Sequence, residues 1–334
     1  MRKSFVIAFS HANGFPAGTY RRLFDHWRSA GHRVIAVERF GHDPARTVTS
    51  NWPHLRDELI ALIEQDRAQH GGGPVHLVGH SLGGYLSLLV ACRRPDLAAG
   101  LVLLDSPVLD GWRAHSVQVM KASGLMKRFS PGRIARKRRW QWPSREAALL
   151  HFSSKPAFAR WHPEVLSDYI TAGMEPDPER GAEPGSQPVR LAFHRDIETR
   201  IYDTLPHHLG SVMARHPPRC AAAYLAGTRS AEGRQVGLAA TRALVHARAP
   251  QAPAHDRLQW IEGSHLFPME RPDETAAAVL SQIAGFAPPQ PEPGSTVTSA
   301  AISTTISAVT SAAISAVTST VTRSAPAAPR SHRP

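Results

Sequence analysis

Cysteine is nearly absent from this chain: Cys92 and Cys220 are the only two, and neither belongs to a C-x-x-C spacing. A disulfide framework or a zinc site is therefore not expected, and a reduced, cytoplasmic protein without metal or cofactor is the simplest interpretation. No stretch offers the roughly 18 apolar residues that a membrane-spanning helix needs. The apolar run at Phe5–Phe9 breaks off at once, so we interpret it as a buried strand rather than a signal peptide.

Acidic residues are the scarcer charged class, with 27 Asp and Glu against 39 Lys and Arg and a formal charge of +12. The segment 113–139 has nine basic residues and no acidic one. A solvated basic face is the simplest interpretation, while binding of an anionic substrate or weak peripheral contact with an anionic membrane stays open. No recognised nucleic-acid module occurs, so nucleic acid is not an expected partner.

Short apolar runs alternate with amphipathic stretches along the first hundred residues. This alternation predicts a mostly parallel, doubly wound α/β sheet. The predicted strands are Phe5–Phe9, Arg33–Val37, Val75–Gly79 and Leu101–Leu104, and the predicted helices are Gly18–Ser29, Pro53–Gln69 and Leu82–Arg93.

The alternation lapses after Asp105 and returns with strands at 221–226 and 257–261 and a helix at 272–284. We therefore expect a core from residues 1–106 and 220–287, with 107–219 as an inserted helical cap. Beyond Pro288 the chain is rich in Pro, Ser, Thr, Ala and Val and has no aromatic residue, so 288–334 is expected to be a disordered low-complexity tail.

The motif Gly79-His80-Ser81-Leu82-Gly83 carries the strongest chemical signal. It is a G-x-S-x-G placed directly after a predicted strand and directly before a predicted helix. Such a sharp turn holds the serine hydroxyl at its apex, and small residues are needed where the backbone approaches itself. Ser81 is the candidate nucleophile, and the Leu82 amide at the helix N-terminus is a candidate donor to an oxyanion.

In these features the chain resembles the α/β-hydrolase superfamily, from Phe5 to about Phe286. Members often carry two strands before the equivalent of Phe5, so we expect a sheet without the first two strands. The stretch His11-Ala12-Asn13-Gly14-Phe15-Pro16 stands where the superfamily has its H-G turn, and the resemblance implies a second oxyanion donor at Asn13, Gly14 or Phe15. The loop 262–272 resembles the catalytic-histidine loop, which implies that His265 is the base.

The acid of a catalytic triad departs from the superfamily pattern. Ser230 stands where an aspartate would be expected, and a serine cannot stabilise an imidazolium by charge. Asp105, at the end of the strand after the nucleophile, is our first choice, because some members such as haloalkane dehalogenases place their acid there. Glu232, or a mechanism without an acid, are the alternatives.

Aromatic residues of the cap, Trp140, Trp142, Phe152 and Trp161, are candidates for covering an apolar substrate, although such residues also form the core of a cap. The expected function is that of a serine hydrolase acting through an acyl-enzyme on a small carboxylic ester or related acyl substrate, possibly an anionic one. A thioesterase, a carbon–carbon bond hydrolase or a non-catalytic binding protein would carry the same residues. A serine nucleophile argues against epoxide hydrolase and dehalogenase chemistry.

Overall fold

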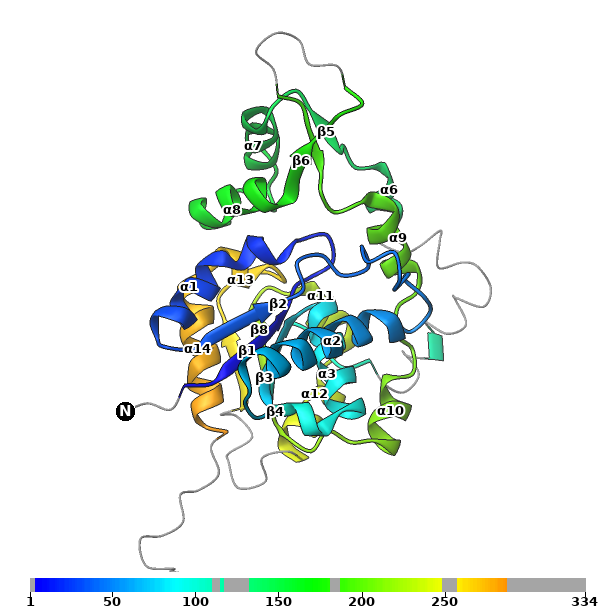
Figure 1. Cartoon of the computed structure of the whole chain (residues 1–334), viewed down its shortest axis with the longest axis vertical. Coiled ribbons are helices and arrows are strands. Elements are labelled where there is room, and N and C mark those ends of the chain that lie inside the picture. The colour runs from blue at the N-terminus through cyan, green and yellow to red at the C-terminus, as the bar shows by residue number, and fades with distance from the viewer. Residues whose placement is uncertain (1–3, 110–114, 117–131, 181–186, 248–256, 287–334) are drawn as a thin grey trace, which may run out of the picture. The chain divides into compact units, whose positions relative to one another are not determined.

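The computed structural model describes residues 4–109, 115–116, 132–180, 187–247 and 257–286 (Figure 1). The chain divides into two units, 1–286 and 287–334. The second unit lies outside the described residues, and so do the predicted tail 288–334 and most of the basic segment 113–139. The predictions for both segments therefore stay predictions.

A six-stranded sheet forms the centre of the first unit, in the order β2-β1-β3-β4-β8-β9. All neighbouring strands in it are parallel. This confirms the α/β class, and the described strands lie within one to three residues of the predicted bounds. The strands are β1 (Val6–Ser10), β2 (Arg33–Ala36), β3 (Val75–His80), β4 (Ala98–Leu104), β8 (Ala221–Gly227) and β9 (Leu258–Ile261).

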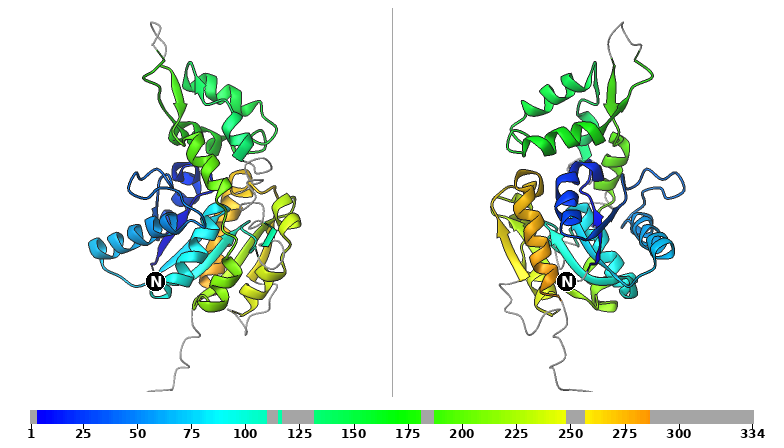
Figure 2. Two further views of the ribbon diagram at one scale, coloured as in Figure 1. Left: turned by 90° about the vertical axis from the view of Figure 1, so that its right-hand side faces the viewer. Right: turned by 60° about the vertical axis from the view of Figure 1, so that its left-hand side comes forward.

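Both faces of the sheet are covered, because side chains that alternate along each strand enter two separate apolar clusters. In β3, Leu77 joins one cluster and Val78 the other. The helices α1 (Arg21–Ser29) and α14 (Pro272–Ala284) cover one face, and α2 (Pro53–His70), α3 (Leu82–Arg93) and α12 (Ala239–Ala247) cover the other (Figures 1 and 2). A strand with two buried faces has a continuous apolar sequence, which is why these strands could be recognised as short apolar runs.

The described residues between β4 and β8 form five helices, and they also form a small antiparallel sheet in the order β5-β7-β6. Its strands have two or three residues each, too few to produce an alternating pattern in the sequence. The elements are α6 (Gly132–Lys137), β5 (Gln141–Trp142), α7 (Arg145–Ser153), α8 (Pro163–Gly173), β6 (Met174–Pro176), β7 (Val189–Leu191), α9 (Arg195–Asp203) and α10 (Leu209–Arg215).

This inserted segment contacts the core through ion pairs as well as apolar side chains. Arg21 of α1 pairs with Asp168 of α8 at 2.7 Å, and Arg22 pairs with Glu164 at 2.5 Å. Phe15, in the loop after β1, packs against the ring of Trp161. An exposed pair such as Arg22–Glu164 contributes about 0–1 kcal/mol, and desolvation of the buried Asp168 carboxylate offsets much of the gain from its pair with Arg21. We therefore attribute most of the attachment to the apolar contacts.

Within the described part of the chain, every helix is too short or too polar to span a lipid bilayer.

Candidate active site

A cavity of about 350 Å³ opens where the loops after β1, β3, β8 and β9 meet. Parallel strands end at one edge of their sheet, and ligands of open α/β sheets bind at that edge. The residues that line the cavity are Ala12, Asn13, Phe15, Ser81, Tyr202, Arg229, Ala231, Glu232, Ser264, His265 and Leu266. Five residues that the sequence singled out thus line one cavity: Asn13, Phe15, Ser81, Glu232 and His265.

Ser81 sits in a strained turn between β3 and α3. Its φ of 54° and ψ of −115° place a non-glycine residue where L-amino acids rarely lie, which is the backbone that the G-x-S-x-G motif predicts. A side chain at Gly83 would overlap the carbonyl group of Ser10, and one at Gly79 would overlap that of Gly83. The glycines therefore permit the close approach that holds the Ser81 backbone in place.

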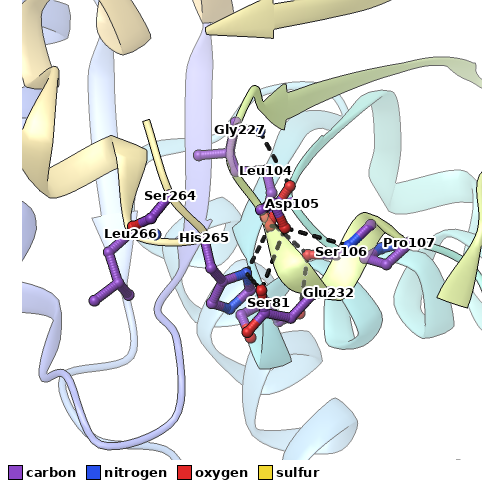
Figure 3. Close-up of polar contacts among 12 residues, drawn as sticks. Ser81, Leu104, Asp105, Ser106, Pro107, Gly227, Glu232, Ser264, His265 and Leu266 are labelled. Atoms are coloured by element: carbon purple, nitrogen blue, oxygen red, sulfur yellow. Dashed lines mark hydrogen bonds and ion pairs between the residues drawn. The ribbon is translucent and has the colours of Figure 1, made fainter. Parts of the chain in front are cut away.

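Asp105 and His265 are joined by a hydrogen bond of 2.7 Å between Oδ2 and Nδ1 (Figure 3). The carboxylate is 1% exposed, and its other oxygen accepts a hydrogen bond of 3.1 Å from the Gly227 amide. Asp105 itself has a φ of 45°, a left-handed conformation that aspartate tolerates better than most residues. A carboxylate at this position can only accept a hydrogen bond, which in the neutral imidazole favours the tautomer with the proton on Nδ1 and the lone pair on Nε2.

Glu232 is the second carboxylate near His265, with 3.8 Å between Oε2 and Nδ1. Its side chain is 46% exposed, in contrast to the fully buried carboxylate of Asp105. Burial lowers the pKa of His265, but the hydrogen bond to Asp105 and the charges of Glu232 and Asp105 outweigh this and hold the pKa above its ordinary value. The imidazolium is thus stabilised within the site.

Ser230 is the residue whose contribution sequence reasoning missed. Its hydroxyl lies 2.5 Å from Oδ2 of Asp105, the oxygen that also bonds His265. The same Oγ accepts a hydrogen bond from the Gly233 amide and so caps α11 (Ala231–Val236). The only signal in the sequence was the absence of an acid at this position. In the structure, the side chain at this position instead forms a hydrogen bond with a carboxylate that follows another strand, β4.

The turn Ala12–Phe15 is the predicted second oxyanion element. The Phe15 amide donates to the Ala12 carbonyl at 3.2 Å, which closes the turn and engages that amide. Gly14 has a φ of 83°, and Asn13 rather than Gly14 lines the cavity. His11 braces the turn, because its Nε2 accepts a hydrogen bond from the Phe40 amide and its Nδ1 donates one to the Ala12 carbonyl.

A buried chain of hydrogen bonds connects this turn to the loop that carries His265. The Ala12 amide donates to the Tyr20 hydroxyl at 3.1 Å, and that hydroxyl donates to His80 Nδ1 at 2.7 Å. His80 Nε2 in turn donates to the carbonyl of His265 at 2.8 Å. Burial, with the nearby charge of His265, lowers the pKa of His80 to about 3. The imidazole is therefore neutral, and it can accept a hydrogen bond at Nδ1 while donating one at Nε2.

The cap aromatics predicted to bind substrate do not line this cavity. Trp142, Phe152 and Trp161 are buried, and Phe152 packs against Trp142 and against Phe158, a neighbour of Trp161. Trp140 is partly buried, with the Arg195 guanidinium above its ring. The cap contributes Tyr202 of α9 to the cavity instead. A substrate role for the four aromatics stays a prediction.

Among the residues that the structure describes, one group is spaced closely enough to hold a metal ion. Ligand atoms of Asp105, Glu232 and His265 lie within 4.8 Å of one another. The Asp105 oxygen and the His265 nitrogen are already joined by a hydrogen bond, so a cation would have to displace their shared proton.

Comparison with known proteins assigns the sequence of this chain to a family. The model of the "Alpha/beta hydrolase family" matches residues 7–278. Monoglyceride lipase of Mus musculus is 28% identical over 129 residues, which are 38% of this chain and 43% of that protein. An abhydrolase domain-containing protein of Alternaria alternata is 28% identical over 235 residues, which are 63% of this chain and 83% of that protein. The match to the monoglyceride lipase thus spans less than half of its length.

Solved structures share the fold. The crystal structure of E-2-(acetamidomethylene)succinate hydrolase superposes with a TM-score of 0.60 at 18% identity, over 84% of this chain and 92% of that one. At this identity the likeness concerns the fold. Since the family model spans most of the sequence, this chain belongs to the alpha/beta hydrolase family.

Proposed function

We propose that this protein is a serine hydrolase that cleaves a carboxylic ester or a related acyl substrate through an acyl-enzyme. The observation that carries the proposal is the 2.7 Å hydrogen bond between Asp105 and His265, beside a cavity that His265 shares with the strained Ser81. The name of the mouse monoglyceride lipase, which contains related sequence, favours an ester among the possible acyl substrates. The expectation of an anionic substrate rests on 113–139 and stays a prediction.

In the proposed mechanism, Ser81 Oγ bonds to the acyl carbon while its proton passes to Nε2 of His265. The tetrahedral intermediate then collapses, the bond to the leaving alcohol breaks, and His265 returns the proton to that alcohol. Water repeats the two steps and releases the acid. Nε2 can act as the base because Nδ1 holds its proton against Asp105.

Asp105 is our choice for the acid, on grounds of contact and burial. It lies 2.7 Å from the imidazole and is held by the Ser230 hydroxyl and the Gly227 amide. Glu232 is more distant from His265 at 3.8 Å and is half exposed, so its charge is screened by solvent. We assign to Glu232 an electrostatic influence on His265 rather than the orienting hydrogen bond.

The oxyanion is proposed to bind the amides of Leu82 and Asn13. Leu82 is the first residue of α3, where amides have no partner within the helix and the helix dipole favours negative charge. In the turn after β1, the Phe15 amide is engaged by Ala12 and Asn13 lines the cavity, which favours the Asn13 amide. Donors fixed in this way stabilise the transition state without reorganising.

Labelling with a fluorophosphonate tests the proposal directly. We expect one adduct per chain by intact-mass analysis, because an activated serine displaces fluoride from phosphorus. Peptide mapping should place the adduct on Ser81. Protein denatured before labelling serves as the control and should remain unmodified. If folded protein forms no adduct while a known serine hydrolase labels in the same buffer, the proposal fails.

The pH profile of kcat/KM should respond to Glu232. The base must be neutral, so activity falls as the pH decreases through the pKa of His265, which Glu232 helps to raise. Replacing Glu232→Gln removes that charge, and the acidic limb should move to lower pH. Glu262→Gln, which removes another exposed carboxylate, is the matched control and should leave the limb in place. A limb that stays fixed or moves upward in Glu232→Gln would contradict this assignment.

A further inference from the structure

A buried carboxylate from the inserted cap lies directly against the turn that carries the proposed oxyanion donor. Glu198, in α9, is 6% exposed. Its Oε1 is 2.9 Å from the point where Gly14 would carry a Cβ atom, so the carboxylate fills the space that a side chain at position 14 would need. The backbone carbonyl of Glu198 also accepts a hydrogen bond of 3.0 Å from Asn13 Nδ2. One cap residue thus contacts two successive residues of the turn.

Glu198 is held in this position by Arg138. The two side chains form an ion pair of 2.8 Å, and Arg138 is only 21% exposed. Burial raises the pKa of Glu198, and the Arg138 charge opposes that rise. Around the pair, Arg195 donates to the carbonyl of Arg138 at 3.2 Å, and the Thr199 hydroxyl donates to the carbonyl of Gly132 at 3.2 Å. The helix that bears Glu198 and the segment that bears Arg138 are therefore fixed to each other.

The ion pair also reduces the repulsion that the Glu198 carboxylate would exert on a nearby oxyanion. A carboxylate beside the Asn13 turn would repel the negative charge that develops on the substrate oxygen in the transition state. Arg138 neutralises that carboxylate while leaving it in contact with Gly14.

We infer that Glu198, paired with Arg138, is a positioning residue that holds the Asn13–Gly14 turn in the geometry needed to bind the oxyanion. The inference rests on the proposed function, since it concerns the same reaction. It makes the inserted cap part of the catalytic machinery rather than a cover alone: α9 contributes Tyr202 to the cavity wall and, one turn earlier, Glu198 to the turn.

The test compares substitutions at this pair with a matched pair elsewhere. Glu198→Ala removes the contact with Gly14, and Glu198→Ala combined with Arg138→Met also removes the buried charge that would otherwise be left unpaired. Glu198→Gln keeps the shape and is the conservative variant. Asp168→Asn is the control, because Asp168 is likewise a buried cap carboxylate, paired with Arg21 at 2.7 Å and attached to α1 instead.

Two readouts separate positioning from folding. The first is kcat/KM for 4-nitrophenyl butyrate. The second is the affinity for an alkyl trifluoromethyl ketone, in which Ser81 adds to the carbonyl carbon, its proton passes to His265 and the carbonyl oxygen becomes the oxyanion. The matched methyl ketone, which binds without forming a stable adduct, reports ground-state affinity.

In Glu198→Ala and in the double variant we expect kcat/KM and trifluoromethyl ketone affinity to fall together, by at least about 10-fold, since losing one oxyanion donor costs about 100- to 1,000-fold. Affinity for the methyl ketone should change less than about twofold, a spread ordinary for a substitution that leaves ground-state contacts intact. Glu198→Gln should recover most of the loss, and Asp168→Asn should resemble the wild type.

The inference is overturned if both alanine variants fold, judged by circular dichroism and thermal unfolding, and keep wild-type kcat/KM. It is equally overturned if Asp168→Asn loses as much activity as they do, because attachment of the cap would then explain the loss. Failure of the proposed function is distinguishable, since wild-type protein would then show neither turnover nor a fluorophosphonate adduct.

Discussion

Replacing Ser81 with alanine is expected to lower kcat for 4-nitrophenyl butyrate by roughly 10⁶-fold, the scale seen when a serine hydrolase loses its nucleophile. The expectation follows from the strained turn, which presents this one hydroxyl to the cavity that contains His265. Without it no acyl-enzyme forms, and only binding and oxyanion stabilisation remain to assist water. Steady-state turnover measures the loss, and the rate of the uncatalysed reaction sets the detection limit of the assay.

The matched control is Ser87→Ala. Ser87 lies in α3, the helix that follows Ser81; it is fully buried, and its hydroxyl has no hydrogen-bond partner among the described residues. Removing an unsatisfied hydroxyl should change neither turnover nor labelling appreciably. Loss of a nucleophile should leave far less than about one hundredth of wild-type turnover. If Ser81→Ala retained more than about one hundredth, the acyl-enzyme mechanism would be wrong.

The second large effect is expected for Asp105→Asn, which should lower kcat by about 10⁴-fold. The amide can present an N–H group to Nδ1 of His265 in place of an acceptor, so the imidazole would favour the tautomer whose Nε2 carries the proton and cannot take one from Ser81. Volume changes little, so unfolding should be affected less than catalysis. Single-turnover acylation and thermal unfolding, measured on the same preparation, separate the two.

A double variant gives a second test of Asp105 as the acid of the triad. Because the Ser230 hydroxyl lies 2.5 Å from Oδ2 of Asp105, a carboxylate at position 230 can reach the same imidazole nitrogen. Asp105→Asn with Ser230→Asp should therefore recover at least about 10-fold of the lost kcat, a part of the factor that a positioned acid supplies. Aspartate also remains a good cap for α11. If Glu232→Gln loses as much activity as Asp105→Asn, Glu232 is the acid instead.

Local chemistry explains why much of the site could be predicted from sequence. The G-x-S-x-G pattern needs small residues around a strained serine, and α3 begins at Leu82 and ends at Arg93 as predicted. His265 and Asp105 follow apolar runs that are now seen as β9 and β4, and parallel strands bring their ends together. Alternation predicted the strands, and the resemblance to the α/β-hydrolase superfamily then selected His265 and Asp105 among the residues that follow them.

Contacts that join distant parts of the chain could not be predicted in the same way. Ser230 bonds Asp105 across 125 positions, and Glu198 meets Gly14 from within the cap. No periodicity encodes such pairs, because each depends on how two separate elements pack. The cap aromatics illustrate the same limit, since a buried tryptophan such as Trp142 and one that lines a cavity have the same sequence signature.

The hydrogen bonds through Tyr20 and His80 have a consequence for proton stoichiometry. Two imidazole rings, those of His80 and His265, lie 5.1 Å apart, a distance at which a pair of titrating histidines would couple. Because the pKa of His80 is about 3, only His265 changes charge as the pH passes through the working range. We therefore expect the acidic limb of the rate profile to be a one-proton transition with a slope of one, because the proposed base titrates while the neighbouring His80 stays neutral.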